Sequence, residues 1–94
     1  MKAWKLLERG WCKGNYARDE MDHPCDVFDS KAVQFCLIGA VKRCYPSSYS
    51  SKLTIVNDHR RILGELKLKQ CLAEWNDSQT SAEPVIALLK ELDI

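Results

Sequence analysis

The segment from Ala32 to Val41 constrains the fold of this chain more than any other stretch. Its apolar side chains would surround a helix instead of forming one stripe along it. They are Ala32, Val33, Phe35, Cys36, Leu37, Ile38, Ala40 and Val41. A short helix that is apolar on nearly all sides is stable when other elements bury it. We therefore predict a central, buried helix from Lys31 to about Cys44, capped by Asp29 or Ser30.

Apolar residues at helical spacing predict three further helices around this one. The first runs from Lys2 to Arg9, and the second runs from Asp58 to about Trp75. The last helix opens with Thr80 and Glu83, which have the spacing of a capping box, and it has Pro84 in its first turn. Its apolar stripe consists of Val85, Leu88, Leu89 and Leu92.

Together these elements predict an all-α protein, a compact four-helix domain over residues 1–94. A length of 94 residues, with 46% hydrophobic and 29% charged residues, suits one globular domain. A long irregular loop separates the first two helices, with a turn at Gly14 and Asn15 and with Pro24 excluding helix. Residues 52–57 fit either an extended segment or the first turn of the following helix. Gly39 is tolerable in the central helix if another helix crosses closely there.

Charge and cysteine usage predict a soluble protein of a reducing cytoplasm. The formal net charge of +1 gives no general attraction to nucleic acid or to an anionic membrane. The five cysteines are odd in number and fall partly in apolar runs, which is unlike a secreted disulfide scaffold. Lys5 and Glu8 interrupt the first apolar residues, so no signal core is expected, and no stretch is long enough to span a bilayer.

The long loop is the first candidate for a binding site, because long loops in small domains are often functional. Arg18 suits bidentate recognition of an anion, with Trp11 or Tyr16 as a stacking surface. The alternative reading, which we favour for these residues taken alone, is that Arg18 pairs with Asp19 or Asp77 and that Trp11 belongs to the core. The predicted ligand- or partner-binding residues are Trp11, Tyr16, Arg18, Asp19, Asn76 and Asp77.

Three other kinds of site have weaker support. His23 and Cys25 with Cys12 are candidate zinc ligands, but the second closely spaced ligand pair of a structural zinc site is missing. Cys12 with a histidine is the minimum for a thiol enzyme, yet no catalytic motif accompanies it. We therefore expect no catalytic residues, no metal and no cofactor. A basic face for nucleic acid is the remaining alternative, and its residues are Arg60, Arg61, Lys67 and Lys69.

Three clusters, taken in order and spacing, resemble an uncharacterised family of small proteins from bacteria and their phages. They are Trp11-Cys12-x-Gly14-x-x-Ala17-Arg18-Asp19, Phe35-Cys36-Leu37-x-Gly39-Ala40, and Trp75-Asn76-Asp77 followed by Val85-Ile86-Ala87-Leu88-Leu89. The resemblance covers most of the chain and implies a compact helical domain, without an established activity or cofactor. It also implies an accessory protein of a phage or mobile element.

The expected function is therefore non-catalytic and stoichiometric. The predicted partner is a host protein, such as a defence protein that the chain inhibits, or a small anionic ligand such as a nucleotide. Nucleic acid is the less favoured partner, because Glu65 interrupts the basic helix face. A homodimer through the exposed part of the stripe from Val85 to Leu92 is a further expectation. If the two motifs meet in space, Arg18 is expected to bridge Asp77, and Asn76 with Asp77 to cap the last helix.

Overall fold

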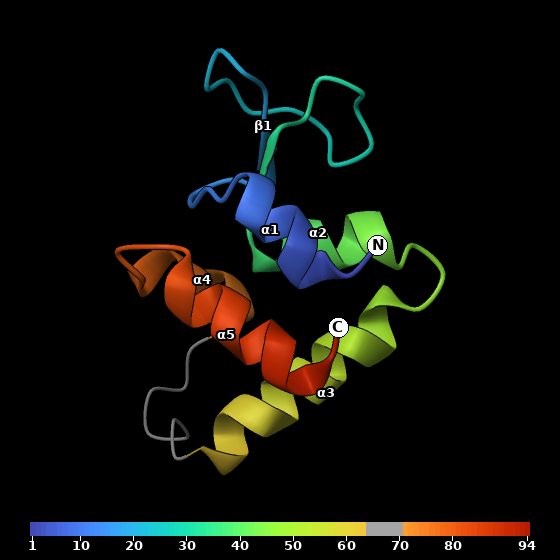
Figure 1. Ribbon diagram of the computed structural model, residues 1–94, viewed down its shortest axis with the longest axis vertical. Coiled ribbons are helices and arrows are strands. Elements are labelled where there is room, and N and C mark those ends of the chain that lie inside the picture. Colours follow the sequence, from blue (N-terminus) through green and yellow to red (C-terminus); the bar gives the residue numbers. More distant parts are fainter. Residues whose placement is uncertain (64–70) are drawn as a thin grey trace.

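The computed structural model describes residues 1–63 and 71–94. Over these ranges the chain forms five helices and one two-stranded antiparallel sheet (Figure 1). The helices are α1 (Ala3–Arg9), α2 (Leu37–Cys44), α3 (Tyr49–Ile62), α4 (Leu72–Ser78) and α5 (Glu83–Leu92); the strands are β1 (Ala17–Arg18) and β2 (Gln34–Phe35). The prediction of an all-α, four-helix domain is therefore wrong.

The sheet forms because the backbone around Phe35 is paired on both sides. Phe35 lies opposite Ala17 in the antiparallel ladder, and it forms a parallel bridge with Trp11. Its N–H donates to the carbonyl oxygen of Gly10 (3.0 Å), and its own carbonyl oxygen accepts from the N–H of Cys12 (3.1 Å). These bonds use the groups that a helix would pair within itself, so β2 replaces the first part of the predicted central helix.

Helix α2 consequently begins at Leu37, and the predicted start at Lys31 is wrong. Cys36 is the N-cap residue, and its thiol accepts from the N–H of Gly39 (3.3 Å). The predicted cap Asp29 instead closes a local turn, in which its carboxylate accepts from the N–H of Lys31 (2.9 Å). The prediction of burial is confirmed for most of this segment, since the side chains from Phe35 to Val41 are buried except for the half-buried Ile38.

Gly39 is required by a close approach of backbone, but the neighbour is a loop and not the expected helix. A Cβ added at Gly39 would collide with the carbonyl oxygen of Tyr16, which belongs to the segment before β1. The same carbonyl oxygen accepts from the N–H of Cys36 (3.2 Å). The loop between α1 and β1 is therefore held directly against the start of α2.

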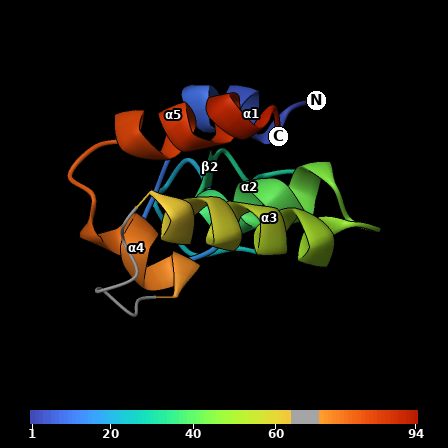
Figure 2. The same ribbon diagram turned by 90° about the horizontal axis from the view of Figure 1, so that it is seen from below.

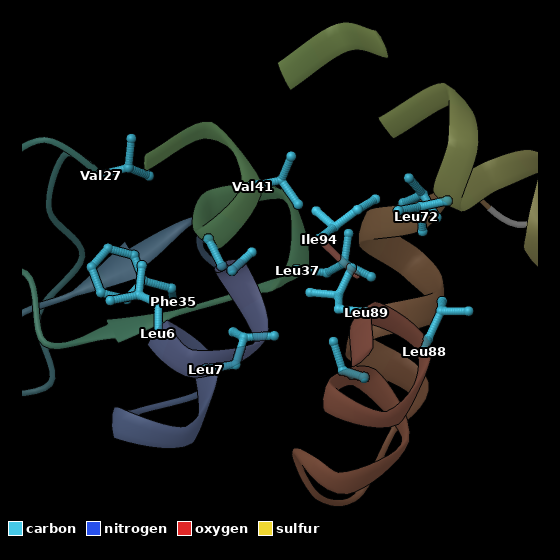
Figure 3. Packing of buried hydrophobic residues seen from close by; sticks show 14 of the residues in the cluster. Leu6, Leu7, Val27, Phe35, Leu37, Val41, Leu72, Leu88, Leu89 and Ile94 are labelled. Carbon is cyan, nitrogen blue, oxygen red and sulfur yellow. The ribbon is translucent and has the colours of Figure 1, made fainter. Parts of the chain in front are cut away.

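The helices form two layers, with α1 and α5 side by side over α2 and α3 (Figure 2). Helix α2 also packs against α4, and β2 packs against α1 and α2. Leu37 and Leu89 are fully buried, and they lie close to Ile94 at the centre of the core (Figure 3). The core thus takes side chains from both layers and from the last residue of the chain.

The second half of the chain differs from its prediction at several boundaries. Helix α3 contains residues 52–57 and Asp58, so the expected start of a helix at Asp58 is wrong. The part of the predicted helix from 64 to 70 lies outside the described residues. Helix α5 has Ala82 as its N-cap residue, without a side-chain cap, so the capping box of Thr80 and Glu83 does not form, whereas Pro84 does occupy the first turn.

The apolar stripe of α5 is confirmed, and it packs within the chain. Val85, Leu88 and Leu89 are buried in the core, and Leu92 is partly buried against it. Little of the stripe is therefore exposed as the dimer contact that was expected there. Of the helices in the described ranges, none combines the length and the apolar character needed to cross a membrane.

Candidate functional site

The sequence motifs that begin at Trp11 and at Trp75 meet at Asn76, which lies in the last turn of α4 and is fully buried. Its Oδ1 accepts from the indole N–H of Trp11 (2.8 Å) and from the backbone N–H of Leu37 (3.1 Å). Its Nδ2 donates to the carbonyl oxygen of Cys12 (3.2 Å) and to Oδ1 of Asp77 (3.2 Å). The side chain is therefore fully used in joining α4, the loop and the start of α2.

Asp77 holds the turn at residues 13–16 against α4. Its Oδ1 accepts from the N–H of Gly14 (2.9 Å). Gly14 has a positive φ of 86°, which glycine adopts without strain and which confirms the turn predicted there. Beside it, Lys13 donates from Nζ to the carbonyl oxygen of Gln79 (3.1 Å), just after α4. This turn is therefore fixed to α4 at two points.

A pocket of about 320 Å³ opens between this turn and α4. It is lined by Gly14, Asn15, Tyr16, Cys36, Ala73 and Asp77. Two of the predicted binding residues, Tyr16 and Asp77, are thus brought together, and Tyr16 is 56% exposed. Among the described residues that line the pocket, Asp77 carries the only full charge.

Arg18 and Asp19 have other partners within the loop. Arg18 donates from Nη1 to the carbonyl oxygen of Asp22 (2.9 Å) and from Nη2 to that of Lys13 (3.4 Å). Its guanidinium also lies 3.8 Å from the carboxylate of Asp22. Arg18 therefore fixes the loop, but its carboxylate partner is Asp22, and the expected pairing with Asp19 or Asp77 is wrong.

Asp19 begins a projecting segment that we call the double loop, residues 19–33, seen as two loops beside β1 in Figure 1. Three aspartates fix its turns by accepting from a backbone N–H two residues further on. Asp19 accepts from Met21 (2.9 Å), Asp26 accepts from Phe28 (2.8 Å), and Asp29 accepts from Lys31. Such turns set the local backbone conformation without help from a core.

Met21 and Phe28 are the functional candidates that the sequence reasoning missed. Met21 is 72% exposed and Phe28 is 51% exposed, although both are large and apolar. The sequence signal was the aspartate two positions before each of them, which predicts a turn that presents the following side chain. The part of the double loop that contains Phe28 is also held by α2, because Arg43 of that helix donates to the carbonyl oxygens of Val27 and Asp29.

The residues considered for thiol chemistry and for metal binding have the following environments. Burial raises the pKa of the Cys12 thiol to about 11, and Arg18 offsets only part of this effect. A thiol with a raised pKa is a poor nucleophile at neutral pH. Over the described ranges, no group of three histidine, cysteine or acidic side chains is placed to hold a metal ion.

The basic-face alternative is incomplete in the described part of the chain. Arg60 is buried and donates to Oδ1 of Asn57 (3.2 Å), whereas Arg61 is exposed. Lys67 and Lys69 lie outside the described residues. A buried arginine does not reach a phosphate on the surface, so Arg60 does not contribute to such a face.

The fold and the site together define a small helical protein with a two-stranded sheet, a pocket against α4 and a projecting double loop. The chain belongs to DUF6197, a family of unknown function, whose model matches residues 2–92. This agrees with the uncharacterised family expected from the motifs. No curated protein and no solved structure matches the chain.

Proposed function

We propose that this protein is a non-catalytic binding protein that docks one partner protein through Met21 and Phe28 of the double loop. The observation that carries the proposal is the exposure of both side chains on turns that Asp19 and Asp26 have already ordered. Binding through ordered turns loses less conformational entropy than binding through a flexible loop. Large exposed side chains on rigid turns are therefore suited to act as anchors in an interface.

The charge around the two anchors specifies the chemistry of the partner. Residues 19–29 contain five carboxylates and no lysine or arginine: Asp19, Glu20, Asp22, Asp26 and Asp29. An interface of this kind is complementary to a basic protein surface with apolar pockets. Association with such a partner should slow as the salt concentration rises, since the exposed charges are screened.

A protein partner has better support from the geometry than the small anionic ligand considered above. Arg18, the residue expected to bind an anion, donates to two carbonyl oxygens and lies beside Asp22. Asn76 is buried and its side chain is engaged on both its oxygen and its nitrogen. The cytoplasmic location belongs to the same proposal and is supported by five free cysteines, which suit a reducing compartment.

An accessory role in a phage or mobile element, with a host defence protein as the inhibited partner, stays a prediction of the family resemblance. This role would identify the partner, but it would not change the residues proposed for the interface. A gene neighbourhood that contains inhibitor genes would support it, and a neighbourhood of replication genes would speak against it.

The test compares three forms of the tagged protein in cells of the organism that encodes it. They are the wild type, the double variant Met21→Ala/Phe28→Ala, and Ile55→Ala as a matched control. Ile55 is 46% exposed and lies on α3, so its replacement removes a comparable apolar side chain outside the double loop.

We expect one stoichiometric partner to copurify with the wild type and with the control, but not with the double variant. With purified partner, the double variant should weaken the dissociation constant at least about tenfold, whereas the control should leave it unchanged. All three forms should have the same unfolding midpoint, because these side chains are exposed. A partner retained equally by the double variant would refute the proposal.

A further inference from the structure

Neither Met21 nor Phe28 lines the pocket between the turn at residues 13–16 and α4, and the proposed function does not use this pocket. Its volume of about 320 Å³ falls at the lower end of the range found for small-molecule sites. We infer that this pocket binds a small organic ammonium group, with Asp77 as the counter-charge and Tyr16 as the aromatic wall.

The carboxylate of Asp77 is oriented before any ligand arrives. Its Oδ1 accepts from the N–H of Gly14 (2.9 Å) and from Nδ2 of Asn76 (3.2 Å). Its Oδ2 has no hydrogen-bond or ion-pair partner among the residues that the structure describes. One oxygen therefore fixes the carboxylate while the other is available to a ligand, and a cation is the group that this charge attracts.

The remaining lining residues suit the apolar part of an organic cation. Tyr16 lines the pocket and is 56% exposed, and a cation over the face of an aromatic ring is attracted by the quadrupole of that ring. Ala73 is apolar, and the thiol of Cys36 is neutral because burial raises its pKa. No lysine or arginine is among the described lining residues to neutralise Asp77.

An anion is disfavoured at this position by the same arrangement. Arg18, the positively charged residue that was expected to bind an anion, is held inside the loop by Asp22 and by the carbonyl oxygen of Lys13. An anionic group in the pocket would approach Asp77 with no positive side chain among the described lining residues, and like charges repel. The ligand class that the pocket selects is therefore opposite in charge to the one that the loop residues predicted.

The experiment is a titration of the full chain, ¹⁵N-labelled, followed through the backbone amide signals of Gly14 and Ala73. The probes are choline, its neutral isostere 3,3-dimethyl-1-butanol, and inorganic phosphate. The test variant is Asp77→Asn, which keeps an oxygen to accept from Gly14 but removes the charge. Asp26→Asn is the control, because it removes one charge from the double loop while keeping the turn acceptor.

We expect choline to shift both amide signals in the wild type and in Asp26→Asn, with the isostere and phosphate causing no saturable change. Asp77→Asn should weaken choline binding about tenfold or more, and Tyr16→Leu should also weaken it. The inference is overturned if choline causes no saturable shift, if the isostere binds equally well, or if phosphate binds in its place.

This titration separates the two proposals. The double variant Met21→Ala/Phe28→Ala should bind choline like the wild type, because neither residue lines the pocket. If choline fails to bind while the double variant still loses its protein partner, the pocket inference fails and the proposed function stands.

Discussion

Trp11 donates its indole N–H to Oδ1 of Asn76 over 2.8 Å, and this bond joins residues that are 65 positions apart in the chain. The same oxygen accepts from the N–H of Leu37, so it also satisfies a backbone donor in the first turn of α2. The motifs around Trp11 and Asn76, which were expected to form a binding site, are therefore joined by a hydrogen bond within the fold. The neighbouring Asp77 is exposed and lines the pocket.

Replacing Asn76 with alanine should strongly destabilise the fold. The change leaves the indole N–H of Trp11, the N–H of Leu37 and the carbonyl oxygen of Cys12 without this partner in a buried site. Each buried group left unpaired costs about 1–3 kcal/mol, so we expect the free energy of unfolding to fall by about 3 kcal/mol or more. Urea unfolding measures this loss.

Two further variants serve as comparisons for Asn76→Ala. Trp11→Phe keeps an aromatic ring but removes the indole donor together with part of the side-chain volume, and it should cost about 1 kcal/mol or more. Asn15→Ala, at a half-buried position outside the hydrophobic core, should change stability by less than about 0.5 kcal/mol. Equal stability of Asn76→Ala and Asn15→Ala would contradict the structural role of Asn76.

The residues that were predicted well are those whose environment is set by local chemistry. The helix at residues 3–9, the turn at Gly14 and the place of Pro84 in α5 all follow from short-range preferences. Burial of the segment around Phe35 also follows, because apolar side chains avoid water in a helix and in a strand alike. Periodicity alone does not separate these two states in a short apolar run.

The errors arose where distant backbone decides the structure. Phe35 is a strand residue because Gly10 and Ala17 flank it in space, and no local pattern at residues 31–36 encodes that pairing. Asn76 was expected, with Asp77, to cap the last helix, but Ala82 is the N-cap residue of α5, and Asn76 is buried and bonds Trp11 and Leu37. The pocket likewise depends on Cys36 meeting Asp77 across the fold.

Gly39→Ala should destabilise the protein, although alanine favours helices. In an exposed helix position the change would stabilise by up to about 1 kcal/mol. At Gly39 the new Cβ meets the carbonyl oxygen of Tyr16, which is backbone and therefore cannot move aside cheaply. We expect a net loss of about 1–3 kcal/mol by thermal or urea unfolding.

The control for this glycine is Ser51→Ala, an exposed position inside α3. It should be neutral or slightly stabilising, because alanine has the higher helix propensity. If Gly39→Ala proved as stable as the wild type, the loop before β1 would not be held against α2 as the structure has it.

Alkaline pH should destabilise the fold through Cys12. Burial raises the pKa of this thiol from its ordinary 9.0 to about 11 in the folded state. Between these values the unfolded chain loses the proton that the folded chain keeps, so stability is complete below pH 9 and falls as the pH rises toward 11. The loss from this group is about 1.4 kcal/mol per pH unit at most.

Cys12→Ala isolates this contribution, because it removes the titrating group from both states. The free energy of unfolding, measured by urea between pH 8 and 10.5, should decrease less steeply in the variant than in the wild type. Parallel curves for the two proteins would show that Cys12 does not titrate with a raised pKa.

The double loop should lose its order when Asp19 loses its carboxylate. Oδ1 of Asp19 accepts from the N–H groups of Met21 and His23, both at 2.9 Å, and these bonds lower the pKa of the carboxyl below its ordinary 3.8. Their stabilising effect is therefore present above pH 3.8 and is lost as the pH falls through the lowered pKa.

Asp19→Ala should speed hydrogen exchange at the amides of Met21 and His23, after correction for the intrinsic rate, whereas Glu20→Ala should leave them protected. Because Asp19→Asn keeps an acceptor that does not titrate, its protection should not depend on this pKa. Equal exchange in Asp19→Ala and Glu20→Ala would mean that Met21 is not held on an ordered turn, and the entropic advantage assigned to its binding would be lost.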